Sequence, residues 1–169
     1  MIRRLFLAAA ALVGAASLSS CATFSNHGDA AKVASTALSQ HDLEVMTSND
    51  LASQAAGATD GVLLPEGELN RNVLTFWVQV TALTQAGTVT QAQMDAVRDI
   101  AAKTYATTWE GAPKQLQDVV LKQIAVANAL QAGTLDRDQV LASISGADVH
   151  VDSRYGWWNP AKVTVTAFG

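Results

Sequence analysis

The sequence predicts a mainly α-helical fold: a four- to five-helix bundle built from two related helical hairpins, with a small C-terminal two-stranded β-hairpin. Apolar residues recur every three or four positions through much of residues 65–146, and a pair of helix-capping signals recurs after 46 residues. With 169 residues, 49% hydrophobic and 15% charged, the composition is that of one folded domain. It excludes a disordered chain, and the single cysteine excludes a disulfide scaffold.

The N-terminal part of the domain is predicted to be helical. Asp29 or Ser25 is placed to cap a first helix that runs to about Met46. The apolar residues on one side of this helix are Val33, Ala34, Ala37, Leu38 and Val45. A short Ala-rich segment follows from residue 48 and ends at Gly57. Residues 57–64 predict a loop, because Gly, Thr, Asp and Gly follow one another without periodicity.

The next two predicted helices have clear ends. Pro65 opens a helix that runs to Ala86. Gly87 follows at the position where a residue in the left-handed conformation commonly ends a helix. Its apolar stripe is Leu69, Val73, Phe76, Val80 and Leu83. Thr90 and Gln93 form a capping-box pattern that starts a further helix, which stops near Gly111.

Two more helices complete the predicted bundle. Pro113 opens the first of them, which ends at Gly133. Its stripe is Leu116, Val120, Ile124, Ala127 and Leu130. Asp136 with Gln139 repeats the cap pair, and a short helix then runs to about Ile144 and closes at Gly146.

The turns that follow the two striped helices are near copies of each other. Residues 85–88 (Gln-Ala-Gly-Thr) recur as residues 131–134, and the two cap pairs lie at the same offset of 46. Two related helical hairpins explain this, and shared capping chemistry without common ancestry is the alternative. Two units are too few for a repeat array, so a bundle is favoured.

Residues 148–168 predict the C-terminal hairpin. Apolar and polar residues alternate at 149–152 and again at 163–167, on either side of a loop over residues 153–161. An isolated hairpin is marginal in water, so this one must pack on the helices or pair with something else.

The first 21 residues have the organisation of an export signal. Arg3 and Arg4 precede an uncharged apolar run from Leu5 to Leu18, which at 14 residues is shorter than the ~20 that span a bilayer. The run ends in Leu-Ser-Ser-Cys at residues 18–21. This segment resembles the lipobox of bacterial lipoprotein signal peptides.

The resemblance implies a lipid anchor at Cys21. Its thiol would become a diacylglycerol thioether, and residues 1–20 would leave as the signal peptide. N-acylation, typically with palmitate, would follow. Residues 21–28 then form the lipidated cysteine and a short tether, and residues 29–169 form a single helical domain. Ala22, in place of an Asp, implies the periplasmic face of the outer membrane in a Gram-negative cell. A secretory signal cut at an Ala or Ser, or a structural cysteine, is the alternative.

The charge balance disfavours nucleic acid as a partner. The chain has 11 basic and 15 acidic residues, a formal net charge of −4, which becomes −6 when Arg3 and Arg4 leave with the signal. No basic stripe is present to bind phosphates or anionic lipid. The tether, residues 22–28, reaches at most ~3.5 Å per residue, so the domain would lie close to the membrane. This favours a partner protein in the cell envelope.

No constellation of catalytic or metal-binding residues stands out. His27, His41 and His150 have no second His or Cys at ligand spacing. We expect His41 to be a partly buried helix residue, and His150 with Asp152 to be a surface pair on a strand. A Gly-x-Ser-x-Gly motif and a phosphate-binding glycine loop are both missing from the sequence. The sequence therefore predicts no cofactor and no metal site, and it favours a protein that is not an enzyme.

The most unusual segment is the loop at residues 154–160, which holds two of the four tryptophans. Exposed aromatic side chains stack on sugar rings or anchor protein partners. The candidate partner- or glycan-binding residues are therefore Arg154, Tyr155, Trp157 and Trp158. The alternative is that they fold back to cap the end of the bundle.

Together these features favour a non-catalytic envelope lipoprotein that binds a partner protein near the membrane and supports assembly or stability of an envelope complex. The alternative function is a cell-wall (peptidoglycan) binding module, hydrolase or hydrolase inhibitor that uses Tyr155, Trp157 and Trp158. A third interpretation adds Val163–Phe168 as an edge strand to a partner's sheet.

Overall fold

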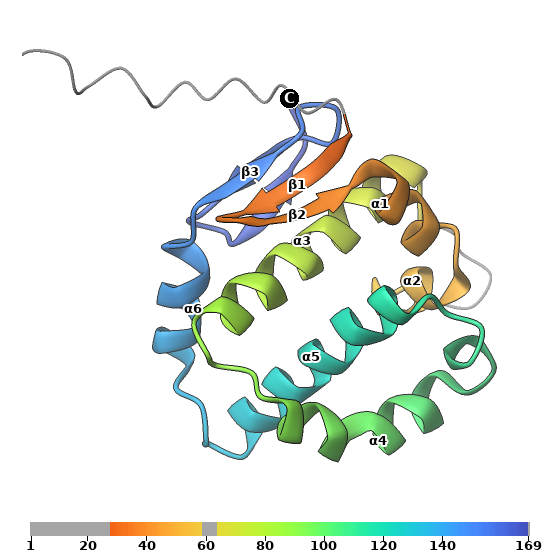
Figure 1. Ribbon diagram of the computed structural model, residues 1–169, viewed down its shortest axis with the longest axis vertical. Coiled ribbons are helices and arrows are strands. Elements are labelled where there is room, and N and C mark those ends of the chain that lie inside the picture. The colour runs from red at the N-terminus through yellow and green to blue at the C-terminus, as the bar shows by residue number, and fades with distance from the viewer. Residues whose placement is uncertain (1–27, 59–63, 169) are drawn as a thin grey trace, which may run out of the picture.

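Two long helices lie side by side in the middle of the fold (Figure 1). In the computed structural model, which describes residues 28–58 and 64–168, these are α3 (Glu66–Gln85) and α5 (Lys114–Gln131). Helix α4 (Gln91–Trp109) packs along α5, and α6 (Arg137–Ser145) packs against α3. The four helices predicted between residues 65 and 146 are therefore present, with ends close to the expected ones.

Short strands and two short helices pack along α3, with hydrogen bonds between the strands and Thr75 in its middle and Gln85 at its end. A three-stranded sheet has the order β2-β1-β3, with antiparallel pairing throughout, and a separate hairpin is made of β4 and β5. The elements are β1 (Asp29–Val33), β2 (Thr36–Ser39), α1 (Gln40–Thr47), α2 (Asp50–Ala55), β3 (Val149–Val151), β4 (Trp157–Asn159) and β5 (Thr164–Thr166). The predicted mainly helical fold with a small C-terminal two-stranded hairpin is confirmed.

The predictions for residues 1–27, including the signal and the lipobox, lie outside the described residues, as does most of the loop expected at 57–64.

The first predicted helix, residues 29–46, is wrong over most of its length, because only Gln40–Thr47 is helical. β1 is the central strand of its sheet, and Ala30, Ala31 and Val33 are all fully buried. A strand buried on both faces shows no alternation of polar and apolar residues, and its alanines favour a helix by propensity. The turn into β2 uses Ala34 at φ +48°, so it carries no glycine or asparagine signal.

The strands of the C-terminal segment pair differently from the prediction. Val149–Val151 joins β1, and the hairpin forms instead between Trp157–Asn159 and Thr164–Thr166. The expectation of a loop over residues 153–161 is therefore wrong in part, because Trp157–Asn159 within it forms the strand β4. Pairing between β1 and β3 joins segments far apart in the sequence, which local alternation cannot predict.

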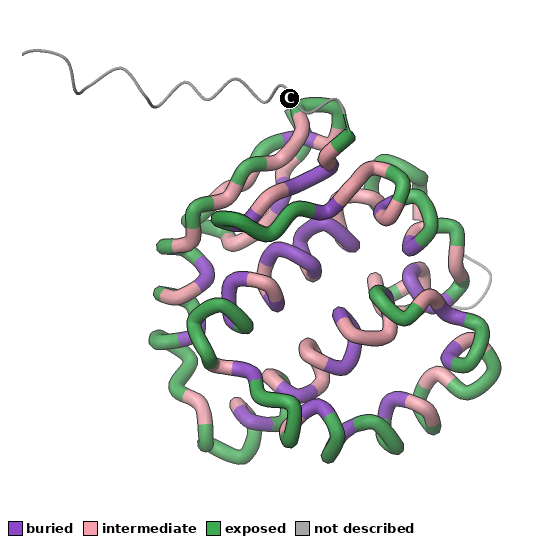
Figure 2. Tube along the Cα trace, viewed as in Figure 1, coloured by how far each residue is buried: buried purple, intermediate pink, exposed green. Residues whose placement is uncertain are grey.

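Helix α3 is the core of the molecule, because other elements cover it on several sides. It contacts α1, α2, α5, α6, β1 and β5, and it carries buried residues along most of its length (Figure 2). The buried residues of α3 are Leu69, Val73, Leu74, Thr75, Trp77, Val78, Val80, Ala82 and Leu83. This set holds four of the five residues of the predicted stripe, leaves Phe76 only partly buried, and adds others such as Thr75, which contacts β5.

The two turns that are copies in sequence also have the same geometry. Gly87 and Gly133 are left-handed, at φ +69° and +67°. In each turn the N–H of the following threonine donates to the helix, from Thr88 to the Leu83 oxygen and from Thr134 to the Ala129 oxygen, both at 2.9 Å. Both turns are therefore Schellman caps at the same offset of 46.

The helices that follow these turns begin with related caps. Thr90 and Gln93 form the predicted capping box. The Asp136 carboxylate accepts the Gln139 N–H at 2.9 Å, which caps α6 in the same register. Each unit is thus a long helix, a Schellman turn and a capped second helix, with α4 packed on α5 and α6 on α3.

Candidate functional site

The four aromatic and basic candidates from the sequence lie on β4 and the turn before it. Arg154 makes a two-pronged ion pair with Asp152, from Nε to Oδ1 at 3.0 Å and from Nη2 to Oδ2 at 2.8 Å. This hydrogen bonding raises the pKa of Arg154. The guanidinium lies 5.9 Å from the Tyr155 ring centroid, so it also makes a cation–π contact. Arg154 is therefore held in place by its neighbours.

The two tryptophans of the loop have different surroundings. Trp158 lies opposite Val165 in the β4–β5 ladder, and Val165 is buried against the core. The Trp158 Nε1 is buried and has no hydrogen-bond partner among the described atoms. Trp157 points to the other side of the hairpin and is 42% exposed. Trp158 therefore packs the hairpin onto the domain, and Trp157 is open to solvent.

Three hydrogen bonds attach residues 163–165 to α3, and one of them joins the hydroxyls of Thr75 and Thr164 at 3.3 Å. The Val165 N–H donates to the Thr75 hydroxyl at 2.9 Å, and Gln79 Nε2 donates to the Val163 oxygen at 2.9 Å. Thr75, at 7% exposure, is the only buried polar side chain among residues 28–58 and 64–168. No pattern in the sequence singles out Thr75 for this role, because a threonine among the apolar residues of a helix is common.

The two histidines of residues 28–58 and 64–168, His41 and His150, belong to no metal-binding cluster. His41 is exposed on α1, so the expectation of partial burial is wrong; α1 turns it outward at its first turn. His150 Nε2 lies 3.2 Å from Asp148 Oδ1, and Asp152 holds Arg154. In the described part of the chain, no three His, Cys, Asp or Glu side chains are placed to hold a metal ion.

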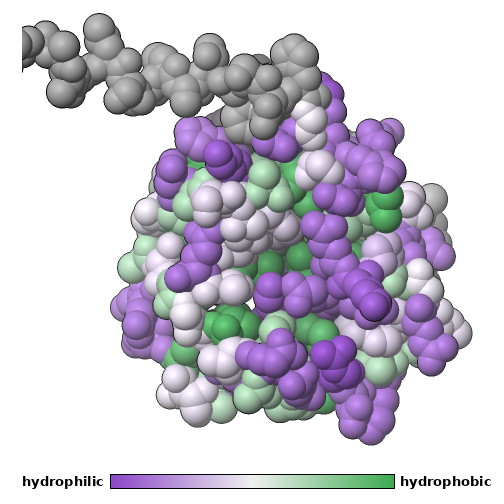
Figure 3. All heavy atoms as spheres, in the orientation of Figure 1, coloured by the Kyte–Doolittle hydropathy of each residue, from purple (hydrophilic) through white to green (hydrophobic). Residues whose placement is uncertain are grey.

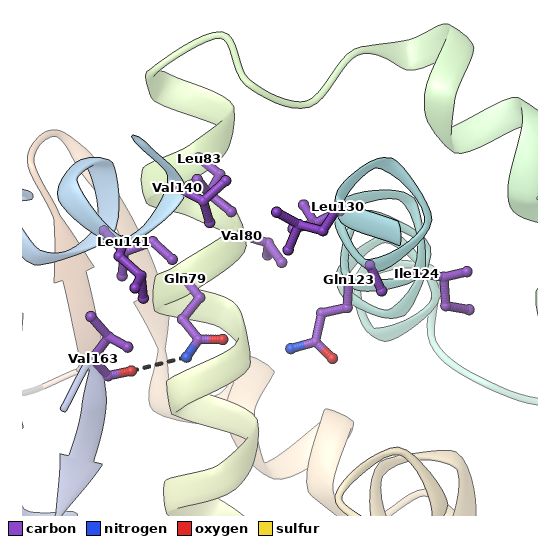
Figure 4. A pocket seen from close by; sticks show the side chains of 12 residues that line it. Gln79, Val80, Leu83, Gln123, Ile124, Leu130, Val140, Leu141 and Val163 are labelled. Carbon is purple, nitrogen blue, oxygen red and sulfur yellow. Dashed lines mark hydrogen bonds between the residues drawn. The ribbon is translucent and has the colours of Figure 1, made fainter. Parts of the chain in front are cut away.

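A groove that the sequence did not predict lies between α3, α5 and α6 (Figure 4). Its volume is about 430 Å³, within the range of ligand and peptide sites. The lining residues are Gln79, Val80, Leu83, Gln123, Ile124, Val126, Ala127, Leu130, Val140, Leu141, Ile144 and Val163. Ten of these twelve residues are apolar and none is charged.

Parts of the predicted stripes form this groove. Ile124, Ala127 and Leu130 belong to the predicted stripe of α5, yet Ile124 and Leu130 are only partly buried and Ala127 is exposed. The buried side of α5 is centred instead on Leu121 and Ala125. The apolar side of α5 is wider than one neighbouring helix can cover. This width is the feature of the sequence that indicates an uncovered apolar surface.

Two glutamines supply the polar atoms of the groove. Figure 4 shows the Gln123 side chain extending from α5 toward Gln79 on α3, whose amide is bonded to the Val163 oxygen. Figure 3 shows hydrophobic atoms in the middle of one face, over α3 and α5, with hydrophilic residues around them. The surface therefore combines an apolar floor with neutral hydrogen-bonding groups.

Val163 lines the groove with a strained backbone. Its φ is +48°, which is rare for a β-branched residue and costs roughly 1–3 kcal/mol. The hydrogen bond from Gln79 to its oxygen holds this conformation, so its side chain stays at the wall of the groove.

No helix among the described residues is both long and apolar enough to cross a bilayer. The sequence matches no protein family and no curated protein, and the fold matches no solved structure.

Proposed function

We propose that the chain is a lipid-anchored, non-catalytic protein of a bacterial cell envelope that docks an amphipathic helix of a partner protein in the groove between α3, α5 and α6. The anchor rests on the lipobox residues 18–21 and their Cys21. The observation that supports docking of a partner helix is the groove, which is largely apolar, has no charged residue in its lining and lies between three helices.

The shape of the groove favours a helix as its occupant. Along α5 its lining runs from Gln123 to Leu130, and the seven steps between these residues correspond to about 10 Å of helix. Anchor side chains at i, i+3 or i+4, and i+7 of a docked helix span the same length. The amides of Gln79 and Gln123 provide neutral hydrogen-bonding groups for the polar edge of such a helix.

The cell-wall alternative has weaker support. It needs Tyr155, Trp157 and Trp158 on one binding surface, but only Trp157 is exposed, and Trp158 packs opposite Val165. The edge-strand alternative uses residues 163–168, of which β5 is already paired with β4 and bonded to Thr75.

A photo-crosslinking amino acid in place of Leu141 tests the proposal in intact envelopes. Leu141 lines the groove and is 40% exposed. Ile100 on α4, at 47% exposure, is the matched control outside it. We expect the probe at 141 to form one adduct that maps to a helical segment of a single protein, and the probe at 100 not to form it. The same adducts from both positions, or none from 141, would contradict the proposal.

A further inference from the structure

The described chain begins at the end of the molecule that carries its exposed aromatic residues. Gly28 precedes β1, and the Asp152 N–H donates to the Ala30 oxygen at 2.9 Å, so the turn after β3 lies beside the start of β1. Figure 1 shows the start of β1, the turn between β3 and β4, and the last described residues together at this end.

Strand pairing brings two exposed aromatic side chains to this end. Trp157 is paired with Thr166, two residues before Phe168. Trp157 is 42% exposed and Phe168 is 62% exposed. Tyr155, partly buried beneath Arg154, lies two residues before Trp157. We call the set formed by Arg154, Tyr155, Trp157 and Phe168 the aromatic end.

We propose that the aromatic end faces the bilayer, with Trp157 and Phe168 in the headgroup region of the membrane that holds the anchor. The inference rests on the lipid anchor at Cys21 in the proposed function. Residues 22–28 reach at most ~25 Å when fully extended, so the aromatic end is the part of the domain held nearest the lipid. Trp and Tyr are enriched at membrane interfaces because their rings are apolar with one polar edge.

The charges at this end favour zwitterionic rather than anionic lipid. Arg154 is paired with Asp152, and burial, together with the carboxylates of Asp152, Glu44 and Glu66, raises the pKa of Tyr155. No excess of positive charge is therefore presented to the membrane, and the contact depends on the aromatic side chains.

This orientation leaves the groove accessible. The groove lines the C-terminal half of α3, at Gln79, Val80 and Leu83. These residues lie about 20 to 25 Å along the helix from Glu66, at 1.5 Å per residue. A partner segment would therefore reach the groove away from the lipid surface.

Tryptophan fluorescence of the acylated protein in phosphatidylcholine vesicles tests the orientation, with bromine on the lipid chains close to the headgroup as the quencher. Trp77 and Trp109 are buried, and Trp158 is partly buried, so Trp157 is the most accessible reporter. We expect brominated lipid to quench part of the emission, and Trp157→Phe to remove most of that quenching.

Two reporters in the Trp157→Phe protein complete the test. Phe168→Trp restores a tryptophan at the aromatic end and should restore quenching. Ile100→Trp places a tryptophan at a position of similar exposure on α4. Helix α4 lies at the opposite end of the molecule in Figure 1, so this tryptophan should not restore quenching. Quenching that Trp157→Phe leaves unchanged, or that Ile100→Trp restores as well as Phe168→Trp, would overturn the inference.

Flotation of the same vesicles separates this inference from the anchor. If the protein floats with the lipid and Trp157 is not quenched, the orientation is wrong, while the anchor and the docking proposal stand. If the protein does not float, the lipid anchor at Cys21 is wrong and the orientation falls with it.

Discussion

Replacing Thr75 with valine tests how the C-terminal hairpin is held on the helices. The Thr75 hydroxyl accepts the Val165 N–H at 2.9 Å and lies 3.3 Å from the Thr164 hydroxyl. Valine keeps the β-branched shape but removes the acceptor. The Val165 N–H then stays buried without a partner, because the contact between α3 and β5 excludes water.

The cost follows from the desolvation of one amide. A buried donor left without an acceptor costs about 1–3 kcal/mol of unfolding free energy. For a domain of this size that corresponds to a fall of about 3–9 °C in Tm. Thr75→Ser is the matched control, since it keeps the hydroxyl and loses one methyl group, worth at most about 0.8 kcal/mol.

Chemical denaturation gives the unfolding free energies, and hydrogen exchange gives the protection of the Val165 amide. We expect Thr75→Val to lower both the stability and the protection, and Thr75→Ser to keep the protection. If the valine variant is as stable as the serine variant and its Val165 amide exchanges no faster, the attachment of the hairpin through Thr75 is refuted.

The remaining predictions concern the aromatic residues and the glycines. Trp158→Ala should lower the unfolding free energy by about 2 kcal/mol, and Trp157→Ala by about 1 kcal/mol or less, by thermal denaturation; equal losses would contradict their different burial. Gly156→Ala should give little folded protein, because its Cβ would collide with the Thr166 oxygen, and a normal yield and circular dichroism spectrum would count against this packing. Gly87→Ala and Gly133→Ala should each cost about 1–2 kcal/mol in urea unfolding, since both lie at similar positive φ in open space; a clear difference between them would argue against equivalent turns.

The helices from residue 65 to 146 could be predicted because their signals are local. Thr90 and Asp136 cap their helices through the backbone three residues on, and Pro65 and Pro113 directly precede helix starts where no side chain makes a cap hydrogen bond. The strand at residues 29–33 could not be predicted. Its pairing with Val149–Val151 comes from the far end of the chain, and its buried alanines look like helix residues.

The candidate site was predictable only in part. The loop at 154–158 stood out by composition, but which tryptophan packs and which is exposed depends on the pairing of β4 with β5. The groove depends on how α3, α5 and α6 are arranged, since no single stripe shows which apolar side chains stay uncovered. The exposure of each tryptophan and the groove both depend on tertiary packing. The sequence pattern identifies only the residues that take part.

The central claim is that the groove binds an amphipathic helix of a partner protein. The most direct test is a titration of a peptide that spans the partner segment crosslinked at position 141, with wild-type protein, Leu141→Glu and the matched variant Ile100→Glu. Glutamate at 141 places a charge in an uncharged groove, so we predict at least a tenfold rise in Kd, or about 1.4 kcal/mol, and no change for Ile100→Glu. Equal affinity of wild-type and Leu141→Glu, or equal weakening in both variants, would contradict docking in the groove.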